Sequence, residues 1–167
     1  MLRVKNYLMA LNPVDLEVLN TAFGMSSAAN EPLNPDVVRS KLGGINEDDF
    51  YVSLEIMEGD GLIATSRKIT RRPSNFWVTS QGVVKLLDKN GQRSVIQAAV
   101  EKAIVAKPNS TLSDIAGSVA QSPVVIAAII ETLENQGEIN IQRGLNGEPQ
   151  ISGVHAELRQ RVQEAGQ

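Results

Sequence analysis

The strongest chemical signal in the chain is a basic cluster, because four of the six residues from 67 to 72 carry a positive charge. These are Arg67, Lys68, Arg71 and Arg72, and Asn75 follows closely. Guanidinium and ammonium groups on a hairpin bind phosphates whatever the base sequence, and an arginine can enter a minor groove. The spacing therefore predicts a nucleic-acid contact through Arg67, Lys68, Arg71, Arg72 and Asn75.

Charge balance is the alternative role of this cluster. The 167 residues contain 16 Lys+Arg and 19 Asp+Glu, which gives a formal net charge of −3. Glu47, Asp48 and Asp49 belong to the same half of the chain and could offset a solvated basic loop. The acidic balance excludes a protein that is basic overall and binds nucleic acid by its whole surface.

The residues needed for common catalytic or metal chemistry are missing. The chain has no cysteine and a single histidine, His155, which we expect at the surface or in a helix cap. It has no GxxxxGK[ST] phosphate loop, and the run from Gly59 to Ala64 fits a turn between a helix and a strand, not a dinucleotide site. We therefore expect no enzyme activity, no cofactor and no metal ion.

The composition is that of a globular protein, with 42% hydrophobic and 21% charged residues. No apolar run approaches the 18 to 20 or so residues of a membrane span, and the N-terminal apolar run is too broken for a signal peptide. The absence of cysteine favours a cytoplasmic protein. The length allows one domain or two small ones.

The chain contains an internal repeat. Residues 54–63 align with residues 130–139 without a gap, so that Glu58 matches Glu134 and Gly61 matches Gly137. Both segments predict a helix that ends in glycine and leads into a strand. Downstream, the strand at Trp77 matches the one at Gln150, and this alignment predicts Thr79 and Ser152 as equivalent caps of a final helix.

Three Asn-Pro or Ser-Pro pairs mark helix starts, at Asn12, Asn34 and Ser122. With the apolar spacing they predict helices at about 13–29, 34–42, 46–59 and 81–88, and again at about 92–107, 112–120, 123–136 and 154–164. Strands are expected at about 62–69, 75–79, 139–143 and 149–152, and Trp77 is expected in the core. The domain boundary is expected in the Asn90-Gly91 turn, which gives domains 1–90 and 91–167.

The second half has the segment Leu112-Ser-Asp-Ile-Ala116, the turn Gln121-Ser-Pro123, a third helix and the hairpin tip Gly144-Leu-Asn-Gly147. The first half has a longer turn, Leu42-Gly-Gly-Ile-Asn46, and ends in Val78-Thr-Ser-Gln-Gly82. This order resembles two winged helix-turn-helix domains in tandem. The resemblance implies a helix-dominated α+β fold, with three helices and a two-stranded wing in each domain and a closing C-terminal helix. It also implies DNA binding, with each third helix in a major groove and the wing against the backbone.

The third helices themselves do not fit base reading, which needs exposed Arg, Lys, Asn or Gln. The first begins with three carboxylates, and the second carries no basic residue. The second has more apolar residues than its own domain core needs, and the surplus predicts a protein interface through Val124, Val125, Ile126 and Ile130. The other half of the chain, a second subunit or another protein could cover them.

Two functions follow from these observations. One is a DNA-associated regulatory or replication-type accessory protein, which contacts DNA through the basic wing and a protein partner or second subunit through apolar helix faces. The alternative is a protein–protein interaction scaffold of tandem winged helices that does not bind DNA. No membrane partner is expected.

Overall fold

The computed structural model describes residues 11–66, 72–145 and 147–167. Within them the chain forms eight helices and two antiparallel sheets of two strands, so the helix-dominated α+β class is confirmed. The elements of the first half are α1 (Pro13–Met25), α2 (Pro35–Lys41), α3 (Glu47–Gly59), β1 (Ile63–Ser66), β2 (Asn75–Val78) and α4 (Ser80–Lys89). Those of the second half are α5 (Arg93–Ala106), α6 (Leu112–Val119), α7 (Pro123–Asn135), β3 (Ile139–Gln142), β4 (Gln150–Val154) and α8 (Ala156–Ala165).

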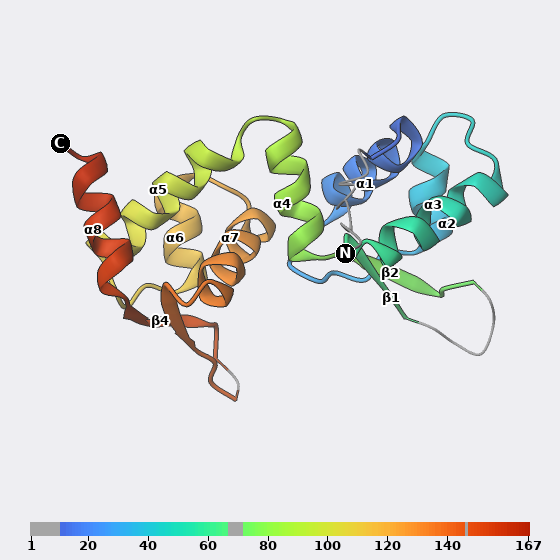
Figure 1. Ribbon diagram of the computed structural model, residues 1–167. Helices are drawn as coiled ribbons and strands as arrows, with labels where there is room; N and C mark the ends of the chain where they lie inside the picture. Colours follow the sequence, from blue (N-terminus) through green and yellow to red (C-terminus); the bar gives the residue numbers. More distant parts are fainter. Residues whose placement is uncertain (1–10, 67–71, 146) are drawn as a thin grey trace, which may run out of the picture.

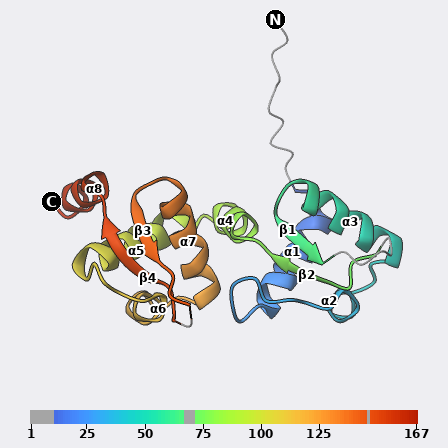
Figure 2. The ribbon, with the colours of Figure 1, turned by 90° about the horizontal axis from the view of Figure 1, so that it is seen from below.

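The two halves lie side by side with α4 between them (Figures 1 and 2). Helices α2 and α3 lie at one end of the molecule and α8 lies at the other, and each half carries its own hairpin. The buried apolar side chains of both halves form one continuous cluster. The division into domains at residue 90 therefore stays a prediction.

Helix starts follow the capping residues found in the sequence. The side chains of Asn12, Asn34 and Ser122 each accept a hydrogen bond from a backbone N–H of the first turn, with proline at the first helical position. Helix α1 ends at Met25, before its predicted end at residue 29. Ser26 has extended backbone angles, and its hydroxyl donates to the carbonyl of Ala22, which closes the last turn.

The internal repeat appears in the backbone as two equal helix ends. Gly61 and Gly137 both have φ +73°, a left-handed conformation that favours glycine. The N–H of Gly61 donates to Glu58 at 3.0 Å, and that of Gly137 donates to Glu134 at 2.9 Å. The repeat also fixes the helix starts, because Asn46 and Ser122 cap helices of 13 residues each, α3 and α7.

The hairpins confirm the repeat but correct its downstream part. Ile63 pairs with Val78 in the first hairpin, and Ile139 pairs with Val154 in the second. The closing helix α4 is capped by Thr79, whereas Ser152 lies inside β4 and α8 begins after His155. The predicted match of Thr79 with Ser152 is therefore wrong. A register shift at Asn140 adds a residue to one strand of the second hairpin, and this local irregularity hid the correct alignment.

Each hairpin also pairs with the segment that precedes the second helix of its half. Leu33 and Phe76 exchange backbone hydrogen bonds of 2.7 and 3.0 Å. In the second half, Thr111 and Gln150 form the equivalent isolated bridge. These contacts tie the start of α2 and of α6 to the sheet, and the sequence pattern gave no sign of them because a single bridging residue has no alternation.

The turn between α6 and α7 is tight and strained at one residue. Ala120 has φ 56° and ψ 44°, a left-handed conformation that costs a residue with a Cβ about 1 kcal/mol.

No single helix of the described residues is long and apolar enough to cross a membrane, and α6 and α7 reach that length and hydropathy only as a pair bent by 114°.

Helix α4 packs on both halves of the chain. It lies against α1 and β2 in the first half and against α7 and α5 in the second, with its most extensive contact on α7. Its first turn approaches the hairpin closely, because a Cβ at Gly82 would lie 2.2 Å from the carbonyl oxygen of Leu62. Glycine at position 82 therefore allows α4 to pack closely against the first hairpin while the helix also packs on α7.

Helix α8 is held by charge as well as by packing. Its buried Leu158 packs in the core, and the Arg161 guanidinium donates to the buried carboxylate of Glu101 at 2.9 and 3.2 Å and to the carboxylate of Glu138. The two carboxylates raise the pKa of Arg161 further above its ordinary value. The three side chains join α5, the start of β3 and α8.

Candidate interaction surface

The first turn of α3 presents three carboxylates, Glu47, Asp48 and Asp49. The side chain of Asn46 caps the helix by accepting from the N–H of Asp49 at 2.8 Å, and its amide donates to the Asp49 carboxylate at 2.6 Å. Acidic groups are stabilised there by the helix dipole. The same groups repel a phosphate backbone, so this helix end does not favour nucleic acid.

Arg72 is held against this acidic turn. Its guanidinium pairs with Glu47, lies 3.7 Å from the Asp48 carboxylate and stacks 4.6 Å above the ring centroid of Tyr51. For Arg72 the contacts fit charge balance within the first half, and the cation–π contact adds to them. The predicted nucleic-acid residues Arg67, Lys68 and Arg71 lie outside the described residues.

Asn75, the fifth predicted nucleic-acid residue, begins strand β2 and is half-buried. It lies opposite Ser66, whose hydroxyl accepts from the Asn75 N–H at 3.1 Å and donates to its carbonyl at 3.2 Å. These bonds place Asn75 at the end of the paired part of the hairpin.

Tyr51 supplies the aromatic platform beneath Arg72. Its ring meets that of Phe50 edge to face, with centroids 5.4 Å apart. Burial raises the pKa of the Tyr51 phenol, and the nearby carboxylate of Asp36 raises it further. The ring presents its face to the Arg72 guanidinium.

An open groove of about 790 Å³ runs between α3 and the first hairpin. Its lining includes Asp48, Tyr51, Val52, Glu55, Glu58 and Arg72. Thr65 on β1 donates to the Glu58 carboxylate at 2.7 Å and ties the strand to the helix across the groove. Three carboxylates, one guanidinium and two apolar side chains make a surface suited to a cationic, partly apolar ligand.

Two apolar side chains of α3 stand in solvent beside these carboxylates. Val52 is 52% exposed and Ile56 is 42% exposed, whereas Phe50, Leu54 and Met57 on the inner face are buried. Sequence reasoning missed this pair, although the spacing of four residues was a usable signal, because it places both on one face outside the core stripe.

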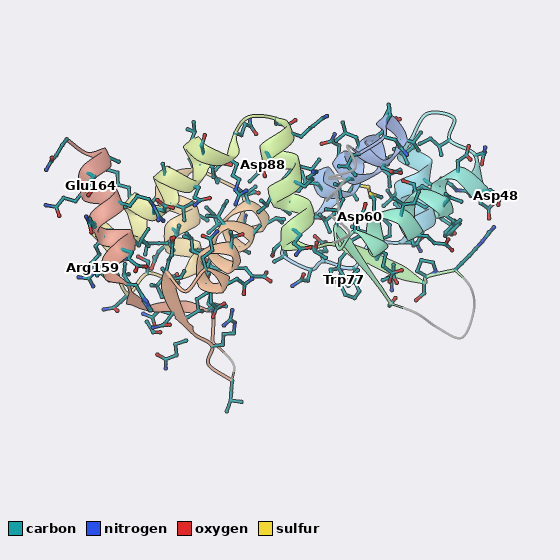
Figure 3. All side chains as sticks on the ribbon, viewed as in Figure 1. Asp48, Asp60, Trp77, Asp88, Arg159 and Glu164 are labelled. Atoms are coloured by element: carbon teal, nitrogen blue, oxygen red, sulfur yellow. The ribbon has the colours of Figure 1, made fainter. Side chains whose placement is uncertain are left out.

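Trp77 is not a core residue, contrary to the prediction. Its neighbours Phe76 and Val78 are 0% and 4% exposed and face the helices, whereas Trp77 is half-buried on the opposite face of the hairpin (Figure 3). Side chains alternate along a strand, so only one of these two sets can face the core. The prediction failed because the rule that one face of a strand is buried does not say which of the two alternating sets of side chains that face carries.

The predicted interface residues of α7 are not on the surface of the molecule. Val124, Val125, Ile126 and Ile130 are at most 4% exposed. Helix α4 packs on α7, and the Ser80 hydroxyl at the start of α4 donates to the Glu131 carboxylate. Of the three expected partners, the other half of the chain lies on α7 through α4, and the four side chains are buried within the chain.

Acidic side chains and a single histidine are the candidate metal ligands of the described residues. Among the described residues, no three acidic or histidine side chains come close enough to hold a metal ion. His155 is exposed at the start of α8 and forms no side-chain cap, so it lies at the surface, one of the two predicted placements.

No protein family, curated protein or solved structure matches this chain. Its function is therefore inferred from the chain's own surfaces. Two of them differ sharply in character: the outer face of α3 is acidic, grooved and open, and the corresponding face of α7 is covered by α4.

Proposed function

We propose that the chain is a pair of tandem winged-helix units that serves as a protein–protein interaction scaffold and does not read DNA. The winged-helix assignment is supported by the order of three helices and a hairpin in each half. The short turn before α7 and the bridges from Leu33 to Phe76 and from Thr111 to Gln150 support it as well. The closing helices α4 and α8 complete the two units.

The observation that supports the scaffold function most strongly is that α4 packs on α7. A third helix that reads bases inserts an exposed polar face into a major groove. Helix α7 has α4 packed on it, and seven of its side chains are buried. Insertion of α7 into a groove would require α4 to leave it, and the apolar surface that the two helices bury against each other would become exposed, which makes base reading by this helix unfavourable.

Helix α3 supports the same function by its charge. Its outer face is open, but Asp48 and Glu55 project from it, and Asp48 lies at the outer end of the helix (Figure 3). Carboxylates at this position oppose a phosphate backbone and favour a cationic protein surface.

A second candidate function is the DNA-associated regulatory or replication-type accessory role. Its support is the density of positive charge in residues 67–72, of which only Arg72 belongs to the described residues. In this role the wing would contribute backbone contacts without base reading.

Fluorescence anisotropy of a labelled random-sequence duplex, titrated at about 50 and 200 mM salt, separates the two functions. We expect no binding by the full chain up to about 100 μM at the lower salt, where weak nonspecific binders still respond. Binding that falls steeply with salt and is lost in the R67A/K68A/R71A/R72A variant would overturn the scaffold function in favour of the second candidate.

A further inference from the structure

The internal repeat supplies a template for what the open face of α3 binds. Because α3 and α7 have equal lengths and equivalent caps, each residue of α3 has a counterpart in α7. One stripe of α7 consists of Val124, Ala128, Glu131 and Asn135, which lie on one helix face by their spacing. Its counterpart on α3 consists of Asp48, Val52, Glu55 and Gly59.

Helix α4 packs on α7 and contacts this stripe at Glu131. Val124 and Ala128 are 3% and 1% exposed, Glu131 accepts from Ser80, and Glu131 and Asn135 line a groove together with Ser80 and Val84 of α4. The stripe thus belongs to a pair of helices packed within this chain, in which Val124 and Ala128 are buried and the Glu131 carboxylate receives a hydrogen bond from the partner helix.

The counterpart stripe on α3 is open. The side chain of Asp48 is 93% exposed, Val52 is 52% exposed, and a Cβ at Gly59 would meet nothing within 4 Å. Among the described residues, no hydrogen bond or ion pair involves Glu55. The stripe lines the groove beside the first hairpin, with Asp48 at the outer end of α3 (Figure 3).

We infer that this α3 stripe docks a basic amphipathic helix of another protein, in the way that α4 docks on α7. The inference rests on the proposed scaffold function and names the partner. Apolar side chains of the partner pack on Val52 and Ile56, and lysines or arginines on either side pair with Asp48 and Glu55. Arg72 already shows the preference of this face for a cation, because it stacks on Tyr51 and pairs with Glu47.

A second copy of this chain fits the stripe less well. Its α8 corresponds to α4, but the residues of α8 that correspond to Val83, Val84 and Leu87 are polar. They are Arg159, Gln160 and Gln163, all exposed. Helix α8 of a second copy therefore lacks the apolar side chains that would pack on Val52 and Ile56.

The test uses two designed alanine-rich helical peptides of about 18 residues, the length at which such helices form in water. Both carry the same Val/Leu stripe, flanked by lysine in one peptide and by glutamate in the other. Each is titrated into the isotope-labelled full chain while the backbone amide shifts are followed. We expect the lysine peptide to bind with a Kd of about 0.1–1 mM and to shift amides of residues 48–59, and the glutamate peptide to cause no shift.

Two variants and a control separate docking from general charge attraction. Val52→Asn leaves the charge unchanged but removes the apolar contact, and we expect binding about tenfold weaker. Glu55→Gln should weaken it by about threefold, as for an exposed ion pair. Val95→Asn changes an exposed valine on α5, in the other half, and should leave binding unchanged.

Three results would overturn the inference. They are no shift with the lysine peptide at about 1 mM, shifts that map outside α3 and the groove, and equal binding by the Val52→Asn variant. Shifts of residues 48–59 that grow with protein concentration alone would make a second copy the occupant and also overturn it. All of these leave the scaffold function standing, whereas duplex DNA that shifts the same amides would overturn the scaffold function itself.

Discussion

Helices α3 and α7 hold the same place in two copies of one unit, but their outer stripes differ. On α7 the stripe contains the buried Val124 and Ala128, and its Glu131 accepts a hydrogen bond from α4, whereas on α3 the corresponding Asp48 and Val52 are in solvent. The inner faces agree, because Phe50 and Ile126 are both fully buried. The comparison shows that the unit's own core needs only one face of its third helix, and the second face is available for another helix.

The inner faces also differ at one position. Ser53 on α3 is buried and donates to the buried Asp15 carboxylate on α1 at 2.5 Å, whereas the corresponding Ile129 of α7 is fully apolar and buried. A buried carboxylate and its hydroxyl donor depend on one another, because either alone would be left without a partner in the core. The first unit therefore carries a polar contact between helices where the second has only packing.

The largest expected effect tests the difference in burial between the α7 stripe and the α3 stripe. Ala128→Glu places a carboxylate at a site on α7 that is 1% exposed and should lower the free energy of unfolding by about 3 kcal/mol or more. Val52→Glu, at the corresponding exposed position of α3, should change it by about 0.5 kcal/mol or less. Urea unfolding of both variants measures the contrast, and equal losses would mean that α4 does not distinguish the two stripes.

The next effect concerns the close packing of α4 against the first hairpin. Gly82→Ala adds a Cβ that would lie 2.2 Å from the Leu62 carbonyl oxygen and 2.9 Å from Val78, so α4 must shift. We expect a loss of about 2 kcal/mol in the free energy of unfolding. Gly24→Ala is the control, because nothing lies within 4 Å of its Cβ and alanine favours a helix interior, so stability should rise by about 0.5 kcal/mol. A neutral Gly82→Ala variant would contradict the close approach of α4 to the hairpin.

The smallest effect compares the two turns that precede the third helices. Gly44 has φ +87° and Ala120 has φ 56°, so each turn contains a left-handed residue, but only the first uses glycine for it. Gly44→Ala should lower the free energy of unfolding by about 1 kcal/mol, and Ala120→Gly should raise it by about 0.5 kcal/mol. Thermal unfolding monitored by circular dichroism measures both, and shifts of the same sign would disprove the equivalence of the turns.

Most of the fold could be predicted from local signals. Helix caps and helix-ending glycines act within one turn of chain, so their positions can be predicted without tertiary contacts. They are Asn12, Asn34, Ser122, Gly61 and Gly137. The site was less predictable. The exposure of Val52 and the burial of Val124 depend on which helix lies outside each third helix, and the face of Trp77 depends on strand orientation.

The sequence by itself determined the repeat, the order of helices and hairpins, and the excess of apolar residues on the helix that begins at Pro123. These features depend on periodicity and capping, which involve only residues close together in the sequence. Only the tertiary structure decided what that surplus meets. Packing of α4 on α7 buries it inside the chain and leaves the matching face of α3 open and acidic. The physical reason is that burial is a property of pairs of surfaces, and the partner surface on α4 becomes adjacent only when both halves of the chain have folded.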